Sequence, residues 1–423
     1  VDATGKITYA PANLLLRSQE FDNAGAWTLE GTTLSGGQIA PDGTATAYLF
    51  TATAPSGNRR ITQVISQVVS VSYVRSIYIR RVTGTGAINL RSPTGSDVDI
   101  TSQISATWNR ISVSGTATGA SNFILAFSVT GDAIEIWGAQ LEPVTYQTTP
   151  STYVATTSAA YYGPRFDYDP ATLQPKGILI EEQRVNLATG SADFTATYWP
   201  VATNAVVTAD NTTSPDGTNN ADRLADNTTA GVQHRIYRDY TFTAASHTLS
   251  VFAKRNDHRW LRLFFFDGTT SFFGNFDLLN GVVGNKQAST TTTITAFGNG
   301  WYRCTMTATT AAAAGNIQLV MLPSDDTAVP VLYTGTGTSL WLFGAQLEAG
   351  SFATSYIPTV ASQVTRSADV ATMTGTNFSS WYNQAEGTFV AAFDSANSIT
   401  VFTSAIASAN DGTNNNYVEL YQY

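Results

Sequence analysis

The sequence contains a single cysteine, Cys304, and only three histidines among 423 residues. One cysteine excludes an internal disulfide and every zinc site that is built on paired cysteines. Charged residues make up only 13% of the chain, with 22 Lys and Arg against 31 Asp and Glu. The net charge of −9 disfavours a phosphate backbone as a ligand, so we do not expect nucleic acid to be a partner.

Long apolar runs are also missing. No run approaches the ~20 residues that a membrane-spanning helix needs, so we expect no membrane insertion. The first residues, VDATG, have neither the charged region nor the apolar core of a signal peptide. The sequence therefore does not indicate export by the general secretory route.

Aromatic residues and glycine are abundant, with 21 Phe, 19 Tyr, 8 Trp and 33 Gly. They occur in short apolar runs that alternate with polar residues and are separated by clusters of Gly, Asn, Asp and Ser. This pattern is typical of half-buried strands, and no segment shows convincing helical periodicity. The sequence predicts an all-β fold of the sandwich or jelly-roll type.

One stretch occurs twice: WGAQLE at 137–142 returns as FGAQLE at 343–348. In each copy an alternating run leads into a glycine that suits a bulge or the close approach of an aromatic ring. Other landmarks recur in the same order, namely Asn13 and Asn186, Trp27 and Trp199, Pro-Asp-Gly at 41–43 and 215–217, and Trp108 and Trp301. The chain therefore contains one sandwich module twice.

The repeat sets the predicted boundaries. We expect a lead-in strand in 1–12, module 1 in 13–155, a β-hairpin joint around an Asp-Pro turn in 156–185, and module 2 in 186–361. A third unit follows in 362–423. Module 2 is 33 residues longer than module 1 between the matched asparagine and glycine, and we place this surplus in loops, where insertions cost little.

Two segments carry a family resemblance. RFDYDP at 165–170 with GILIEEQRVNL at 177–187 resembles the joint of bacteriophage head-spike, head-fibre and tail-fibre proteins. GAQLEAGSFATSYIPT at 344–359 resembles the end of the carbohydrate-binding-module-like jelly rolls that flank this joint. Residues from Gly387 onward resemble the start of a concanavalin-like or laminin-G-like sandwich. The joint departs from the common pattern at Gln183, Val185 and Ala188, and these changes are conservative for a strand.

The resemblance implies tandem jelly-roll sandwiches joined by a hairpin, followed by the incomplete start of a lectin-like sandwich. It also implies a homotrimer on the surface of a tailed-phage virion, in the tail or on the capsid, whose partners are other virion proteins and a host-surface glycan or polysaccharide. We therefore predict a fibre or spike protein that binds host glycan. The alternatives are a structural adaptor or capsid-decoration protein, and the binding region of a polysaccharide depolymerase.

Catalytic patterns are missing. The histidines, His234, His247 and His258, lack the helical spacing of a zinc site, and no nucleophile elbow or phosphate loop occurs. Pairs of carboxylates such as Asp97 and Asp99 have a simpler explanation in turn hydrogen bonds. We expect no enzymatic activity.

Glycan sites place an exposed aromatic ring beside polar side chains. Aromatic residues that both copies share serve a shared core, so residues found in one copy only are the better candidates. These candidates are Tyr198, His258, Arg259, Trp260, Phe272 and Phe273. The alternative is that they are core residues of module 2.

Calcium is the one cofactor that the sequence leaves open. Glu20 and Asp193 follow the first strand of each copy, and Glu142 and Glu348 lie in the last strand. If these strands are neighbours, each copy brings together two carboxylates, which are ligands that calcium prefers. The alternative is that they are solvent-facing edge charges that discourage aggregation.

Overall fold

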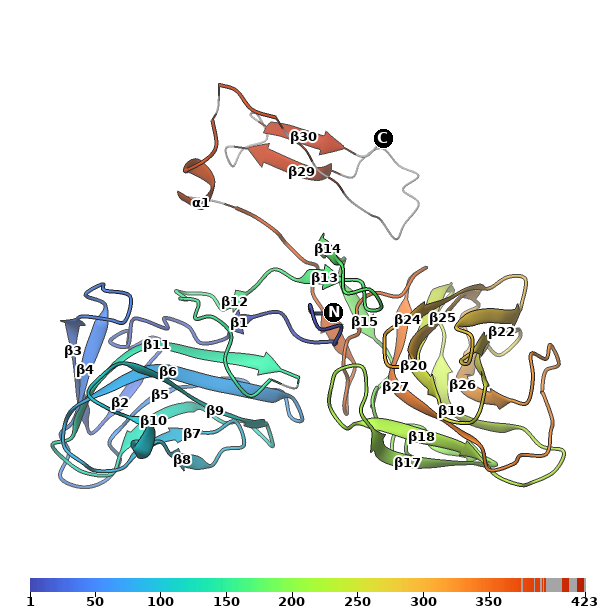
Figure 1. Cartoon of the computed structure of the whole chain (residues 1–423), viewed down its shortest axis with the longest axis horizontal. Coiled ribbons are helices and arrows are strands. Elements are labelled where there is room, and N and C mark those ends of the chain that lie inside the picture. Colours follow the sequence, from blue (N-terminus) through green and yellow to red (C-terminus); the bar gives the residue numbers. More distant parts are fainter. Residues whose placement is uncertain are drawn as a thin grey trace.

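The computed structural model describes residues 1–145, 147–373, 376–383, 385–388, 390, 392, 405–410 and 417–421. Across these residues the fold is almost entirely antiparallel β-structure, as the sequence predicts. The two modules form two sandwiches that lie side by side, with a small hairpin at the joint between them (Figure 1). No helix among the described residues is long and apolar enough to cross a membrane.

Module 1 consists of two five-stranded sheets with an apolar core between them. The first sheet has the order β2 (Thr28–Glu30), β5 (Arg60–Gln63), β10 (Phe123–Phe127), β7 (Ile88–Arg91) and β8 (Asp97–Asp99). The second has the order β3 (Thr32–Gln38), β4 (Ala47–Ala52), β11 (Ala133–Val144), β6 (Ser72–Thr83) and β9 (Asn109–Thr116).

Module 2 repeats this arrangement with six strands in each sheet. The first sheet has the order β16 (Val201–Thr203), β19 (His234–Thr241), β26 (Ala314–Leu322), β21 (Trp260–Phe266), β22 (Ser271–Asp277) and β23 (Val282–Lys286). The second has the order β17 (Ala205–Thr212), β18 (Ala221–Asp226), β27 (Ser339–Ala349), β20 (Ala245–Arg255), β25 (Trp301–Thr310) and β24 (Thr291–Ala296). The strand order is that of module 1, so the tandem repeat is confirmed.

The additional strands correct one expectation. β23 and β24 each add an edge to one sheet, so part of the surplus of module 2 forms strands and not loops. The Thr-rich residues of β24 pair along their whole length with β25, from Thr291 with Thr307 to Ala296 with Tyr302. β-branched threonine fits such a half-exposed edge.

The repeated glycines have the predicted role. Gly138 and Gly344 have φ angles of 61° and 64°, and the pairing register of β11 and β27 shifts at both positions. A Cβ atom on Gly138 would lie 3.2 Å from the ring of Tyr153, and one on Gly344 would lie 3.2 Å from the ring of Tyr356. Each glycine therefore forms a bulge against which a tyrosine packs.

A buried asparagine fastens the ends of each module. Asn13 and Asn186 are fully buried, and each side chain donates to two carbonyl oxygens and accepts from two backbone N–H groups. For Asn13 these are Ala139 O at 3.0 Å, Val154 O at 2.9 Å, and Leu15 N and Leu141 N, both at 3.2 Å. For Asn186 they are Ala345 O at 3.2 Å, Ile357 O at 2.8 Å, Ala188 N at 3.0 Å and Leu347 N at 3.1 Å.

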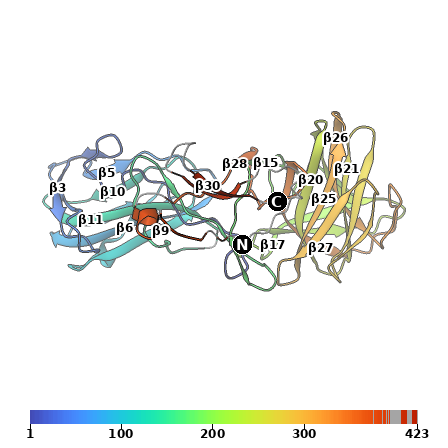
Figure 2. The same ribbon diagram turned by 90° about the horizontal axis from the view of Figure 1, so that it is seen from above.

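The joint contains the predicted hairpin, in which β13 (Phe166–Tyr168) pairs with β14 (Pro175–Ile178). Two further pairs flank it: β1 (Ala12–Asn13) pairs with β12 (Tyr161–Tyr162), and β15 (Arg184–Asn186) pairs with β28 (Val364–Arg366). Figure 2 shows from above that the joint lies between the two sandwiches.

The predicted lead-in strand is wrong over most of its length, because only Ala12 of residues 1–12 belongs to a strand. The preceding segment makes hydrogen bonds to both modules, and in module 1 Thr8 Oγ1 also accepts from Gln147 Nε2 at 2.7 Å. Ile7 N donates to Pro215 O of module 2 at 3.1 Å, and Ile7 O accepts from Thr145 Oγ1 of module 1 at 3.4 Å. Its backbone groups therefore make isolated hydrogen bonds and do not pair with a neighbouring strand.

The predicted third unit, 362–423, is described only in part, and most residues from Gly387 onward lie outside the described residues. Its described elements are β28, which pairs with β15, then α1 (Thr376–Ser379), and the antiparallel pair of β29 (Ala405–Asn410) and β30 (Tyr417–Tyr421).

Candidate functional site

One sheet of module 2 has an unusual outer surface. Side chains alternate along a strand, so those between the core-facing Leu261, Leu263 and Phe265 of β21 point away from the core. We call this surface the outer face of module 2. It consists of Arg235 and Tyr237 of β19, Gln318 and Val320 of β26, Trp260, Arg262 and Phe264 of β21, and Phe273 and Asn275 of β22.

The pairing register arranges these side chains in rows across the strands. One row runs Tyr237, Gln318, Phe264 and Phe273. The next runs Arg235, Val320, Arg262 and Asn275. Aromatic rings and hydrogen-bonding groups therefore occur together on this side of the sheet, as they do in sugar-binding sites. Phe264 and Phe273 are buried in a small cluster with Val331, whereas Tyr237 and Trp260 are partly exposed.

Module 1 lacks this surface. Its matching sheet can be aligned because Leu125 pairs with Leu90 as Leu319 pairs with Leu263. The matching rows then run Thr62, Ile124, Arg91 and Asp97, and Arg60, Ala126, Asn89 and Asp99. The aromatic side chains of the outer face are thus specific to module 2.

A loop over residues 323–333 crosses part of the outer face, and Arg262 holds it there. The guanidinium of Arg262 donates to Asn275 Oδ1 at 2.8 Å, to Ala328 O at 2.7 Å and to Asp326 O at 2.5 Å, and it stacks on Phe273 at 4.2 Å. Arg262 is 1% exposed, and burial lowers its pKa to about 10, so it stays charged at neutral pH. The loop is therefore fixed before any ligand binds.

Trp260 differs from the other tryptophans. Six of the eight donate their indole N–H within the described part of the chain, namely Trp27, Trp108, Trp137, Trp301, Trp341 and Trp381. The N–H of Trp199 is buried without a partner. Trp260 is partly exposed, and its N–H reaches the surface with no acceptor among the described residues. It is therefore free to donate to a ligand.

The surroundings of Trp260 fix its ring. The guanidinium of Arg259 lies 5.3 Å from the ring centre, and a Cβ on Gly284 would lie 2.7 Å from its edge. Arg259 is held in turn by two hydrogen bonds to Asp277, at 2.9 and 2.6 Å. The Arg259 hydrogen bond is the main reason that the pKa of Asp277 falls to about 2.

This pKa gives a pH prediction. Since the folded pKa of Asp277 lies below its ordinary value of 3.8, its contribution to stability is full above pH 4 and is lost as pH falls towards 2. We expect the melting temperature of module 2 to fall over this interval, and Asp277→Asn to lower it at pH 7 and to flatten the fall. An equally steep acid dependence in Asp277→Asn would contradict this role.

The structure separates the six predicted glycan-binding residues. Trp260 lies partly exposed on the outer face, and Arg259 lies at its edge. Phe273 is on the same side of the sheet but is only 5% exposed, because it packs in a cluster with Val331 of the loop. Phe272 points into the core of module 2, and His258 is 6% exposed with its Nδ1 2.9 Å from Thr338 Oγ1. Burial lowers the pKa of His258, so its ring is neutral and internal.

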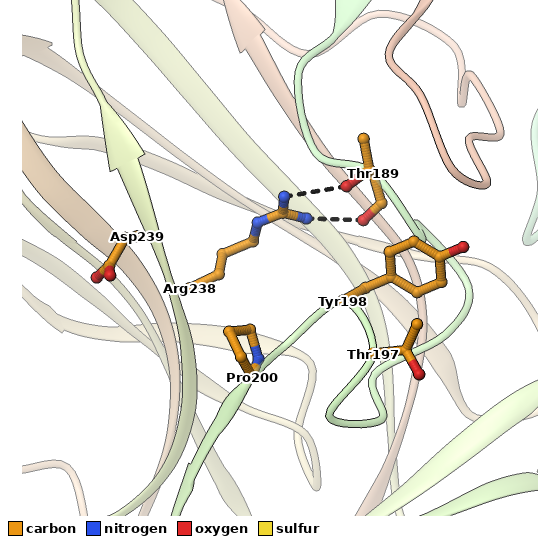
Figure 3. Close-up of a pocket in the computed structure, with 6 residues that line it drawn as sticks. All are labelled: Thr189, Thr197, Tyr198, Pro200, Arg238 and Asp239. Atoms are coloured by element: carbon orange, nitrogen blue, oxygen red, sulfur yellow. Dashed lines mark hydrogen bonds between the residues drawn. The ribbon is translucent and has the colours of Figure 1, made fainter.

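Tyr198 lies apart from the outer face, in a shallow depression of about 270 Å³ (Figure 3). Arg238 crosses this depression and donates to Thr189 O at 2.7 Å and to Thr189 Oγ1 at 3.0 Å. At the matching place in module 1, the side chain of Gln63 donates to Leu16 O at 2.8 Å. Because both modules have this hydrogen bond between the strand and the first segment of the module, the role of Arg238 is to stabilise the fold.

The four predicted calcium ligands each have local partners. Glu142 accepts from Ser151 N at 2.7 Å and Oγ at 2.6 Å, and Glu348 accepts from Thr354 N at 3.0 Å and from Thr354 Oγ1. Both are almost fully buried, so they are not the solvent-facing edge charges of the alternative interpretation. They brace the loop that follows the last strand of each module.

The other two carboxylates lie near the first strand of each module. Glu20 pairs with Arg17 at 2.9 Å, and Asp193 accepts from Thr195 N at 2.9 Å. Among the described residues, no three His, Cys, Asp or Glu side chains are grouped so that they could hold a metal. Calcium would have to displace the donors that these carboxylates already bind.

Sequence reasoning missed Arg235, Tyr237, Arg262 and Phe264. Their signal was the run WLRLFFF at 260–266, whose alternation puts Trp260, Arg262 and Phe264 on one side. The contribution of β19 could not be found in this way, because only the pairing register brings it to the same surface.

No protein-family model matches the sequence, and no curated protein does. Among solved structures, the chain is similar to the N-terminal CBM22-1-CBM22-2 tandem domain from Paenibacillus barcinonensis Xyn10C, with 9% identity over 81% of this chain and 99% of that chain and a TM-score of 0.28. It is also similar to a chain of Sulfolobus Turreted Icosahedral Virus, with 9% identity over 82% of this chain and 68% of that chain and a TM-score of 0.21. At these TM-scores the similarities do not identify a shared function.

Proposed function

We propose that this chain is a non-catalytic surface protein of a phage virion, a fibre or spike in the tail or on the capsid, and that it binds host-surface glycan through the outer face of module 2. The observation that carries this proposal is the set of aromatic side chains on that face, which module 1 lacks at the matching positions. The family resemblance of the joint supports the virion setting and a homotrimer.

The outer face has groups for both parts of a sugar. The apolar side of a pyranose ring packs on an aromatic ring, and Tyr237 and Trp260 are partly exposed on this surface. Hydroxyl groups of the sugar can accept from the indole N–H of Trp260. They can also donate to the remaining acceptor positions of Asp325, which borders Trp260 across Gly284 and whose carboxylate accepts from Asn275 Nδ2 and Asn285 N. Since Arg262 already fixes the loop, little ordering is needed on binding.

The experiment is a glycan array probed with the intact protein, followed by titration calorimetry with the best ligand. We expect specific binding with one site per chain, because module 1 has no equivalent surface. Absence of binding to every glycan and to host cells would contradict the proposed function. Two sites per chain would contradict its assignment to module 2.

The hydrogen bonds between Arg262 and the loop give a further prediction. Arg262→Lys retains the charge but loses the forked geometry that reaches two carbonyl oxygens. We expect glycan affinity to fall about tenfold, since a charge-assisted hydrogen bond contributes about 1.5 kcal/mol or more. Calorimetry measures this change.

Asn89→Ala, at the matching position of module 1, is the control and should bind as the wild type does. Equal affinity of Arg262→Lys and the wild type would show that the loop does not order the site.

A further inference from the structure

The outer face of module 2 contains an arginine without a counter-ion. Arg259 is paired with Asp277 at 2.6 Å, and all three nitrogen atoms of the Arg262 guanidinium donate to protein oxygen atoms. Arg235 of β19 forms no ion pair with a carboxylate in the described part of the chain, and its Nη1 donates to Gln318 Oε1 at 2.7 Å. The positive charge of Arg235 is therefore not neutralised by the protein.

Module 1 has the same arginine with a counter-ion. In the matching row of module 1, Arg60 stands in the place of Arg235. Glu30 of β2 lies directly opposite Arg60, and its Oε1 accepts from Arg60 Nε at 2.9 Å and from Nη2 at 2.8 Å. Thr203 of β16 lies directly opposite Arg235 in the same way. Module 2 thus has a threonine where module 1 has the glutamate that neutralises the arginine.

The guanidinium of Arg235 is held in a fixed position. Its Cζ atom lies 4.7 Å from the centre of the Tyr237 ring, and Gln318 is itself fixed because it donates to Asn316 Oδ1 at 2.7 Å. Nε is buried without a partner, whereas Nη2 reaches the surface with no acceptor among the described residues. Burial lowers the pKa of Arg235, but a guanidinium stays charged at neutral pH. Arg235 therefore presents a positive charge and unused N–H groups beside a partly exposed aromatic ring.

We propose that Arg235 and Tyr237 bind an acidic sugar, whose carboxylate accepts from Nη2 of Arg235 while the apolar side of its ring packs on the exposed part of Tyr237. This inference rests on the proposed function, because it names the class of glycan that the outer face binds. A carboxylate carries one negative charge, which a single guanidinium balances, and its planar oxygens suit the planar donors of arginine. The net charge of −9 opposes an anion only weakly at physiological salt, because exposed charges are screened beyond about 8 Å.

Matched pairs of ligands test this class. The intact protein is applied to an array on which uronic-acid and sialic-acid oligosaccharides stand beside their carboxyl-reduced forms, and the best pair is titrated by calorimetry. We expect the acidic form to bind about tenfold more tightly, since a hydrogen bond to a charged group is stronger than a neutral one. The preference should shrink as sodium chloride is raised from about 0.05 to about 0.5 M, because salt screens the charge of Arg235.

The difference between the modules supplies the variants. Thr203→Glu places a glutamate opposite Arg235, as in module 1, and should lower affinity for the acidic form about tenfold while affinity for the carboxyl-reduced form stays within about twofold. Arg235→Gln should have the same effect, so the test does not depend on the folding of one variant. Val206→Glu is the control, because Val206 is 54% exposed on the other sheet and the substitution adds the same charge there. It should bind both forms as the wild type does.

The outcomes separate this inference from the proposed function. If the wild type binds the acidic and the carboxyl-reduced forms equally, or if folded Thr203→Glu and Arg235→Gln keep the preference, Arg235 does not select a carboxylate and the proposal is overturned. Glycan binding by the outer face would then still stand. A sulfated probe that binds more tightly than its carboxylated counterpart would also overturn it. Absence of all glycan binding would contradict the proposed function and this inference together.

Discussion

Trp260→Ala is expected to weaken glycan binding about thirtyfold. Removing the ring exposes apolar sugar surface that was buried against it, which costs about 2 kcal/mol. The substitution also removes the one surface indole N–H that has no acceptor among the described residues. The fold should persist, because Trp260 is only partly buried and lies outside the main core of module 2. Titration calorimetry on the intact protein measures the loss.

Trp341→Ala is the matched control. Trp341 is also a partly buried tryptophan of module 2, but it lies on the other sheet and donates to Asn211 Oδ1 at 2.9 Å. We expect its affinity to stay within twofold of the wild type. If both variants bind equally well, or if Trp341→Ala loses more, the ligand does not occupy the outer face.

Asn186→Ala is expected to destabilise module 2 by about 4 kcal/mol. The substitution removes four hydrogen bonds in a fully buried place and leaves two carbonyl oxygens and two N–H groups with lost partners, which cost about 1 kcal/mol or more each. Asn13→Ala should have the same effect on module 1. Denaturant unfolding with separate probes for the two modules measures both changes.

The control for the asparagine is Asn58→Ala, in which an exposed side chain loses a single bond to Glu30. It should change stability by less than about 0.5 kcal/mol. Independent unfolding of the two modules would show which module each asparagine supports. If Asn186→Ala unfolds as the wild type does, the four hydrogen bonds of Asn186 do not stabilise module 2.

The sequence was sufficient to predict the tandem fold because the features that define it are local and occur twice. Gly138 and Gly344 stand in nearly identical hexapeptides, and each marks a bulge against a tyrosine. Asn13 and Asn186 are likewise matched, although three of the four hydrogen bonds of each reach residues more than 100 positions away. A repeat shows which residues matter before the contacts are known.

The site was harder to predict because it is assembled by pairing between distant strands. Tyr237, Phe264 and Gln318 stand in one row of the sheet, although 81 positions separate the first from the last. Phe272 and Phe273 are adjacent in the sequence, and strand alternation sends one into the core and the other to the outer face. Comparing the two copies found Trp260, and only the register could add its neighbours.

Indole N–H signals in a two-dimensional ¹H–¹⁵N spectrum of the intact protein test the central claim most directly. Trp260→Phe identifies the signal of Trp260 among the eight. We predict that this signal exchanges fastest with water among the tryptophans of the two modules, and that it shifts most when the bound glycan is added. A ligand that shifts another tryptophan and leaves Trp260 unchanged would contradict a glycan site on the outer face of module 2.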